Sequence, residues 1–266
     1  MFMPPMLGAQ LYTVRAFTQT ADDIAASLKR VAAIGYPAIQ ISGFGPVAPQ
    51  EVARLVEEAG LTVAATHMPW ERFLRAIDEV IAIHKLWGCC HAAIGGLPAE
   101  YTTVEGIQRF VVELEPVATA LAAEGIDFSY HNHRHEFRHY PTQGGHKPWL
   151  ELLLEQAPPA LLNIELDTYW VQAGGGDPAA WIRRCAGRLP VLHLKDMVIG
   201  PEGEPRMAEV GEGNLNWPAI LRAAQESGVK WILVEQDECY GNDPFAALAS
   251  SYHNFFALWR QLPDKG

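Results

Sequence analysis

The stretch NIELDTYW, residues 163–170, sets two carboxylates, Glu165 and Asp167, among apolar residues. Side chains two apart in a β-strand point to the same face, so a strand here would aim both acids in one direction. A short apolar run of this kind is typical of a buried strand. We therefore interpret residues 163–167 as a buried strand whose end contributes to a polar site.

Similar apolar runs recur along the whole chain, separated by amphipathic stretches. The runs are LGAQLYTV (7–14), AIQIS (38–42), LTVAATH (61–67), CCHAAIGG (89–96), IDFSYHNH (126–133), LLNIELD (161–167), PVLHLKD (190–196) and KWILVEQD (230–237). Helical periodicity predicts helices at about 20–34, 50–60, 71–87, 104–124, 146–157, 178–187, 216–227 and 243–261. Thr20 is the expected N-cap of the first helix, and Gly35, Gly60, Gly88, Gly125 and Gly228 are expected to end helices.

Eight strands alternating with eight helices predict an α/β fold, a single-domain (β/α)8 TIM barrel over residues 1–266. A doubly wound open sheet is the alternative, and it would favour a GxGxxG turn after the first strand. That position reads YTVRAFTQT (12–20), which contains no glycine. The glycine-rich pieces QGGH (143–146) and AGGGDP (173–178) are interpreted as loops of the barrel and not as linkers.

The bulk composition limits the class of protein. Hydrophobic residues make up 49% of the 266, which is enough for a large core, and the formal net charge of −11 disfavours nucleic acid as a partner. None of the four cysteines forms a CxxC pair, so a zinc knuckle or thioredoxin motif is not indicated. The N-terminus MFMPPMLGAQ has neither a basic region nor a long apolar run, so we expect a cytoplasmic protein without a membrane partner.

Polar side chains gather where the predicted strands end, which in a barrel is where chemistry takes place. These residues are Gln10 (strand one), His67 (three), His131 and His133 (five), Glu165 and Asp167 (six), His193 and Lys195 (seven), and Glu235 and Asp237 (eight). Any one of them alone is more often a hydrogen-bonding group than a ligand. Together, imidazole and carboxylate suit Mn²⁺, Zn²⁺, Co²⁺ or Fe²⁺, and the lack of thiolates favours an open catalytic site over a structural zinc site.

At these residues the chain resembles the sugar phosphate isomerase/epimerase superfamily of xylose isomerase-like TIM barrels. The likeness covers nearly the whole chain, through LGAQLYTVR (7–15), YHNHRHEF (130–137), ELDTYW (165–170), HLKD (193–196), VGEGNLNW (210–217) and VEQD (234–237), in that order. It implies a divalent metal (Mn, Zn, Co, Fe or Mg) and a sugar or polyol substrate. It does not fix the reaction, because the superfamily includes epimerases, isomerases, dehydratases, lyases and an abasic-site nuclease.

The ketose 3-epimerase branch holds its metal by Glu, Asp, His and Glu from strands five to eight. By motif, the resemblance carries the last three onto Asp167, His193 and Glu235. The first Glu has no counterpart, and YHNH places a histidine there, either His131 or His133, with His131 preferred. The two opposed glutamates of the epimerase mechanism are therefore not both present.

The same resemblance implies a substrate-binding position at Trp170, where epimerases have His, and another at Glu136. Gln10, His67 and His133 are further expected to bind substrate from their strand ends. Glu235 is the preferred catalytic base and Lys195 the second candidate. The alternative for Lys195 is an ion pair with Glu165 or Asp237. Glu165 is expected to orient a metal ligand from behind.

These residues leave four functional hypotheses. The leading one is a metal-dependent sugar isomerase or epimerase that removes a proton next to a carbonyl to give an enediolate. The second is a dehydratase or β-eliminating lyase on a keto-inositol or 3-keto-glycoside, which does not need bases on both faces. An abasic-site nuclease conflicts with the acidic charge, and a non-catalytic sugar-binding barrel leaves the polar strand ends unexplained. The aromatics Tyr252, Phe255, Phe256 and Trp259 indicate packing of the last helix first and a homo-oligomer face second.

Overall fold

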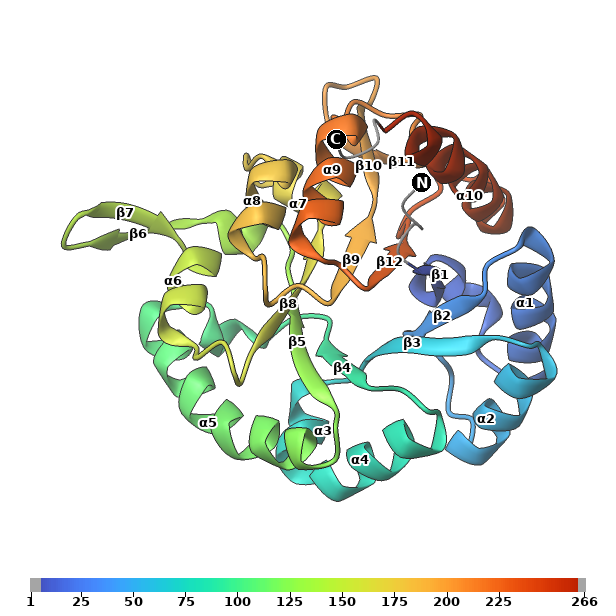
Figure 1. Cartoon of the computed structure of the whole chain (residues 1–266), viewed down its shortest axis with the longest axis horizontal. Helices are drawn as coiled ribbons and strands as arrows, with labels where there is room; N and C mark the ends of the chain where they lie inside the picture. The colour runs from blue at the N-terminus through green and yellow to red at the C-terminus, as the bar shows by residue number, and fades with distance from the viewer. Residues whose placement is uncertain (1–5, 263–266) are drawn as a thin grey trace.

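Eight parallel strands close into a barrel in this computed structural model, which describes residues 6–262. Around the barrel the order is β1 (Met6–Gln10), β12 (Trp231–Val234), β9 (Val191–Leu194), β8 (Asn163–Asp167), β5 (Asp127–His131), β4 (His91–Ile94), β3 (Thr62–His67) and β2 (Ala38–Ile41), as Figure 1 shows. β1 closes the ring by pairing with β12 on one side and β2 on the other. The predicted single-domain (β/α)8 barrel is confirmed.

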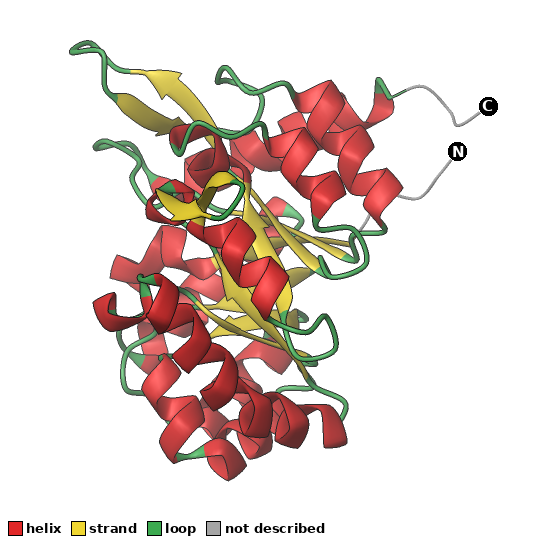
Figure 2. Ribbon diagram, turned by 90° about the vertical axis from the view of Figure 1, so that its left-hand side faces the viewer, coloured by secondary structure: helices red, strands yellow, loops and turns green. Residues whose placement is uncertain are grey.

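Helices surround the strands on the outside of the barrel, as the side view in Figure 2 shows. They are α1 (Ala21–Ile34), α2 (Pro49–Glu58), α3 (Trp70–Arg75), α4 (Ile77–Leu86), α5 (Val104–Ala123), α6 (Trp149–Gln156), α7 (Thr168–Ala173), α8 (Pro178–Arg184), α9 (Trp217–Ser227) and α10 (Pro244–Arg260), with 3-10 turns at Leu11–Phe17, Ala99–Tyr101 and His135–Phe137. Thr20 caps α1 by accepting the backbone N–H of Asp23. The five glycines predicted to end helices all have positive φ.

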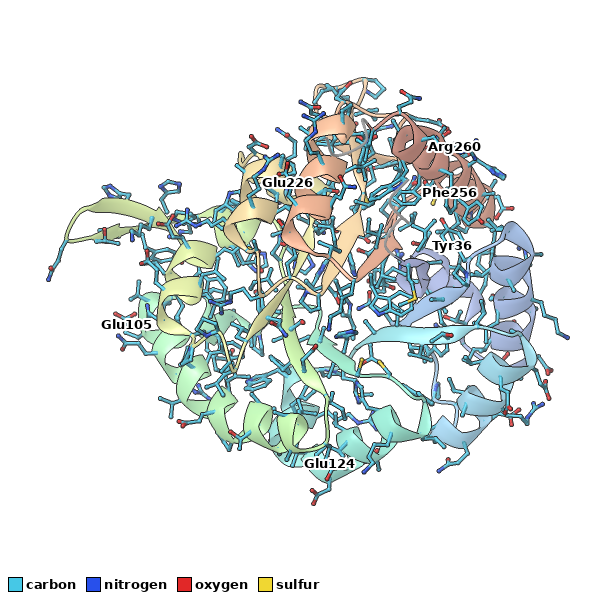
Figure 3. The ribbon with its side chains drawn as sticks, viewed as in Figure 1. Tyr36, Glu105, Glu124, Glu226, Phe256 and Arg260 are labelled. Carbon is cyan, nitrogen blue, oxygen red and sulfur yellow. The ribbon has the colours of Figure 1, made fainter. Side chains whose placement is uncertain are left out.

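The core lies in two places, inside the barrel and between the barrel and the helices, where side chains fill the space (Figure 3). α1 illustrates the outer layer, since Ile24, Leu28 and Val31 form one fully buried stripe. Tyr36, labelled in Figure 3, follows this helix, and its hydroxyl donates to the carbonyl of Leu248 in α10. The first and last helices are thereby tied together and the ring of helices is closed.

Two antiparallel hairpins interrupt the regular alternation, and the sequence pattern did not predict them. β6 (His139–Thr142) pairs with β7 (Gly145–Pro148) in an arm that projects from the barrel (Figure 1). The helix expected from residue 146 therefore begins only at Trp149, because residues 145–148 form the second strand of this arm. The structure also divides the helix expected over 71–87 into two helices, α3 and α4. The break lies at Ala76, whose φ of −143° and ψ of 44° are not helical.

The second hairpin, β10 (Asp196–Ile199) with β11 (Pro205–Ala208), follows β9 directly. Its first residue, Asp196, is fully buried and organises the VGEGNLNW loop. The Asp196 carboxylate accepts the backbone N–H groups of Met197, Gly211, Gly213 and Leu215 and the indole N–H of Trp217. A Cβ at Gly213 would lie 2.2 Å from Asp196 Oδ1, so the motif requires glycine there.

No helix within residues 6–262 is long and apolar enough to cross a membrane. The expectation of a cytoplasmic protein without a membrane partner rests partly on residues 1–5, which lie outside the described residues.

Candidate metal centre

Four strand ends bring His131, Asp167, His193 and Glu235 together at one mouth of the barrel. His131 and Asp167 are the last residues of β5 and β8, and Asp167 pairs in register with His193 of β9. Glu235 follows β12 directly. One ligand atom from each of the four lies within 4.8 Å of those of the other three, and all four side chains are buried. These are the four residues that the sequence predicted as metal ligands.

Two of these buried side chains have an atom that needs a partner. His131 Nδ1 and Asp167 Oδ2 form no hydrogen bond within residues 6–262, and Asp167 Oδ2 has only a 2.9 Å ion pair with the ammonium of Lys195. Unsatisfied buried polar atoms are costly unless a ligand, ion or water completes them. Burial and the neighbouring imidazoles lower the pKa of His131, so its ring is neutral and can coordinate a cation. The residues present therefore fit a divalent metal.

His193 is the most extensively contacted of the four. Its Nδ1 lies 3.0 Å from Glu235 Oε2, and its Nε2 lies 2.7 Å from Gln40 Oε1 and 3.0 Å from Glu165 Oε1. Burial alone would lower the pKa of His193, but the charges of Glu165 and Glu235 outweigh it and raise the pKa to about 10. A proton on this ring thus offsets the carboxylates around it. A cation bound by the ring would displace that proton and take over its role.

Glu165 lies deeper in the barrel, which explains why β8 aims two acids in one direction. Its carboxylate accepts two hydrogen bonds from Gln40 Nε2, at 3.0 and 3.1 Å, and contacts His67 Nε2 as well as His193. Burial raises the pKa of Glu165, but His193 and His67 lower it further, well below its usual range. Asp167 thus meets the cluster of ligands, and Glu165 orients His193 from behind.

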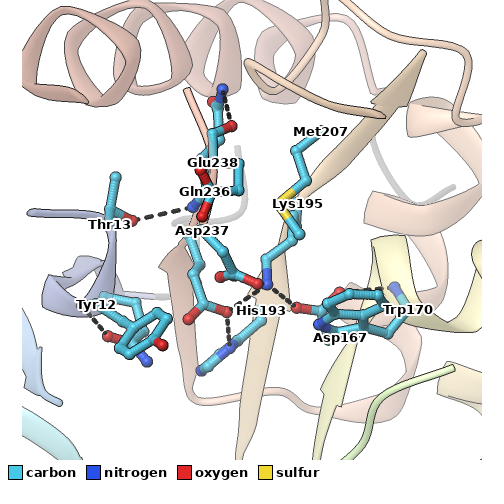
Figure 4. A network of polar contacts seen from close by, with 12 residues as sticks. Tyr12, Thr13, Asp167, Trp170, His193, Lys195, Met207, Gln236, Asp237 and Glu238 are labelled. Atoms are coloured by element: carbon cyan, nitrogen blue, oxygen red, sulfur yellow. Dashed lines mark hydrogen bonds and ion pairs between the residues drawn. The ribbon is translucent and has the colours of Figure 1, made fainter. Parts of the chain in front are cut away.

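A buried ammonium lies beside the ligand cluster (Figure 4). Lys195 Nζ lies 2.9 Å from Asp167 Oδ2, 2.8 Å from Glu235 Oε2 and 2.9 Å from Asp237 Oδ1, and the side chain is fully buried. Burial opposes the charge of Lys195, yet the three carboxylates raise its pKa above the ordinary value. The side chain therefore stays protonated, which favours the ion-pair interpretation over a base. Its partners include the expected Asp237, but Asp167 and Glu235 take the place of Glu165.

Asp237 is a polar group that the sequence placed at the end of strand eight and suggested as a partner for Lys195. Burial and the charge of Glu235 raise the pKa of Asp237 to about 6, against the opposing effect of Lys195. It also lines the cavity above the ligand cluster. The in-phase spacing of Glu235 and Asp237 in VEQD is the signal that places both on one side of this cavity.

A cavity of about 480 Å³ opens over the cluster. Its walls comprise Tyr12, Ser42, Gly43, His67, Met68, Pro69, Gly95, Gly96, His131, His133, Glu235 and Asp237. Its size lies within the range of sites for small ligands. Of the residues expected to bind substrate, His67 and His133 lie in this wall.

The other three residues expected to bind substrate, Gln10, Glu136 and Trp170, are not among the residues that line the cavity. Gln10 accepts the backbone N–H of Tyr12 at 2.7 Å. The buried Glu136 carboxylate accepts the hydroxyl of Tyr130 at 2.6 Å and the backbone N–H of His133 at 2.8 Å, so it shapes the loop after β5.

Trp170, from α7, packs at the side of the cluster. Its ring lies 5.4 Å from that of His133, and Lys195 Nζ lies 5.4 Å from its ring centroid. The indole therefore covers the buried ammonium, an arrangement that stabilises the positive charge.

Comparison with known proteins agrees with this architecture. The family model described as xylose isomerase-like TIM barrel matches residues 28–251. A sugar phosphate isomerase/epimerase from Parabacteroides distasonis ATCC 8503 superposes with a TM-score of 0.79 and 22% identity, covering 95% of this chain and 98% of that one. An L-ribulose 3-epimerase superposes with a TM-score of 0.73 and 16% identity, covering 99% of this chain and 100% of that one. A D-allulose 3-epimerase from Methylomonas sp. superposes with a TM-score of 0.70 and 14% identity, covering 97% of this chain and 100% of that one. A search of curated proteins gave no match.

Proposed function

The chain belongs to the family of xylose isomerase-like TIM barrels, and from that premise we propose that it is a divalent-metal-dependent isomerase or epimerase of a keto-sugar or polyol. The observation that carries the proposal is the convergence of four buried ligand atoms, within 4.8 Å of one another, at the mouth of the barrel. Solved epimerases of L-ribulose and D-allulose share the fold and support a small sugar as substrate.

The proposed metal set is His131, Asp167, His193 and Glu235. Mn²⁺, Zn²⁺, Co²⁺, Fe²⁺ or Mg²⁺ held by these four residues would supply Lewis-acid chemistry next to a substrate carbonyl. Glu165 and Gln40 hold the imidazole of His193 in position at 3.0 and 2.7 Å. This support keeps the ring orientation fixed, which is what a catalytic metal site needs.

Glu235 is the proposed base, because it lines the cavity and its carboxylate is ionised. Burial would raise the pKa of Glu235, but the charges of Lys195 and His193 lower it well below the usual range. Lys195 is fully enclosed, so it acts as a positioning residue that holds Glu235 through the 2.8 Å contact. On the wall contributed by β3 and β5, the imidazoles of His67 and His133 supply hydrogen-bonding groups for sugar hydroxyls.

A dehydratase or β-eliminating lyase is the second candidate, and one observation favours it. The two carboxylates in the cavity wall, Glu235 and Asp237, both follow β12 and hence lie on one side. Elimination needs a base at one carbon and an acid at its neighbour, which groups on one side can supply. Epimerisation at a single carbon instead needs proton transfer at both faces.

The test is incubation of the metal-loaded protein with a panel of ketohexoses and keto-inositols in deuterated water. Deuterium incorporation with a change of configuration or carbonyl position supports the isomerase or epimerase. Loss of water, with deuterium at the reacting carbon, supports the lyase. If neither deuterium exchange nor elimination occurs with any of the five metals, the result contradicts enzymatic proton abstraction. It would then favour a non-catalytic sugar-binding barrel.

A further inference from the structure

A second hollow, of about 610 Å³, adjoins the cavity over the ligand cluster. Ser42, Gly43, His67, Met68 and Pro69 belong to the walls of both, so the two hollows meet along the ends of β2 and β3. We refer to the second hollow as the annex. It lies between the loop after β2 and the segment that links β3 to α4.

The annex differs from the cavity in its chemistry. The cavity carries three imidazoles and two carboxylates, whereas Phe44, Val47, Val52, Ile83 and Trp87 make up much of the annex wall. The charged pair Arg72 and Glu79 lies at the annex as a mutual ion pair. These five apolar side chains can contact a hydrocarbon or aromatic group of a small ligand.

The wall formed by residues 42–47 is fixed in place by hydrogen bonds. Gly45 donates its N–H to the carbonyl of Thr18 at 2.9 Å, and the Gln19 amide donates to the carbonyl of Gly43 at 2.9 Å. A Cβ on Gly45 would lie 2.0 Å from the carbonyl oxygen of Gln19, so this close approach requires glycine.

The part of the annex wall at the end of α4 is held in a similar way. Trp87 donates its indole N–H to the carbonyl of Pro49 at 3.0 Å, which fixes the ring at the end of α4. Both parts of the wall are therefore positioned without a ligand. A preformed wall can bind a ligand without a large entropy cost for ordering its side chains.

We propose that the annex is a subsite for an apolar, preferably aromatic, substituent of the substrate, whose sugar part occupies the cavity. The substrate class is then a keto-sugar or polyol that carries an aryl or other apolar substituent. The inference rests on the proposed function, because the cavity must take a sugar. The argument for this occupant is continuity, since a group attached to a sugar beside His67 and Met68 has direct access to the annex.

The test is calorimetric titration of the metal-loaded protein with phenyl and methyl D-glucopyranosides, both anomers, as probes. The phenyl glycoside of one anomer is expected to bind at least about tenfold more tightly than its methyl counterpart, a typical discrimination for an apolar pocket. Phe44→Ala, at a half-buried wall residue, should remove most of that preference and leave methyl glycoside affinity within about twofold. Val112→Ala, at an exposed residue of α5, is the matched control and should change neither affinity.

Circular dichroism checks that each variant is folded, and Val47→Ala replaces Phe44→Ala if the latter fails to fold. Equal affinity for phenyl and methyl glycosides, or a phenyl preference that survives both annex variants, would overturn the subsite while leaving the sugar site intact. Binding of neither glycoside would overturn the subsite as well, and deuterium exchange with the free ketoses then decides separately whether the proposed function stands.

Discussion

Lys195 Nζ lies 2.8 Å from Glu235 Oε2, and the same nitrogen lies 2.9 Å from oxygens of Asp167 and Asp237. One buried ammonium thus faces three carboxylates, two of which belong to the proposed metal set. The surplus of negative charge attracts a further cation, while Lys195 keeps the acids ionised and in place. The buried lysine and a divalent metal therefore act together at this site.

Replacement of Lys195 tests this relationship. Lys195→Met leaves three carboxylates, two of them buried, without their shared ammonium, so the unfolding free energy should fall by about 3–5 kcal/mol. Metal should then restore more stability in the variant than in the wild type, because it replaces the missing positive charge. Urea denaturation with and without Mn²⁺ measures both effects, and Lys29→Met, at an exposed position of α1, is the control. An unchanged midpoint would contradict the charge argument.

The proposed base makes a separate prediction. Glu235→Gln keeps the shape of the side chain but removes the proton acceptor, so solvent deuterium exchange into the substrate should fall by about 10²–10⁴-fold. Mass spectrometry of the recovered sugar measures the rate. Glu238→Gln alters a carboxylate that pairs with Arg15 outside the cavity wall and should leave exchange unchanged. Full exchange by the Glu235 variant would assign the base to another group.

Asp196 should be a purely structural acid. Asn at this position turns one acceptor oxygen into an NH₂ group that faces backbone N–H donors of the 210–217 loop. Asp196→Asn should therefore cost about 2–3 kcal/mol of unfolding free energy. Thermal or urea unfolding provides the measurement, and Asp78→Asn, at an exposed residue of α4, serves as the reference. Equal stability of the two variants would show that the five-donor arrangement contributes little.

His84 predicts a pH dependence of stability that is independent of the metal centre. Burial lowers the pKa of His84, whose ring nitrogens lie 2.8 Å from Thr66 Oγ1 and from the carbonyl of Val80. The unfolded chain binds the proton more tightly, so the contribution to stability is complete above about pH 6.5 and is lost as the pH falls toward the lowered folded value.

Comparison of variants isolates this contribution. His84→Gln should flatten the loss of stability below about pH 6.5, whereas His253→Gln, at an exposed residue of α10, should not. Urea midpoints between pH 5 and 8 are the measurement. If His84→Gln loses stability with falling pH as steeply as the wild type does, this histidine is excluded as the source of the pH dependence.

The barrel and the four proposed ligands were predictable because both depend on local pattern. Apolar runs fix the strands, and a residue such as Asp167 at a strand end must lie at the mouth of the barrel. The hairpin 139–148 was missed, because HYPT and GHKP carry no apolar alternation and face solvent. The helix predicted from residue 146 was wrong for the same reason.

Contacts across the barrel could not be predicted from the sequence. Gln40 on β2 contacts His193 on β9 and Glu165 on β8, and these partners lie more than 100 positions apart in the chain. Phase along a strand indicates that Lys195 points inward, but not which carboxylates it meets. The choice of Asp167 and Glu235 over Glu165 depends on depth within the barrel, which periodicity does not encode.

Metal content tests the central claim most directly. The purified wild-type protein, the double variant Asp167→Ala with His193→Ala, and a surface control, Asp22→Ala with His253→Ala, are loaded with Mn²⁺, Zn²⁺, Co²⁺ or Fe²⁺, desalted and analysed by plasma mass spectrometry. We predict about one equivalent of metal in the wild type and the surface control, and loss of it in the site variant. Absence of metal from all three proteins, or equal retention by the site variant, would contradict a metal centre at these residues.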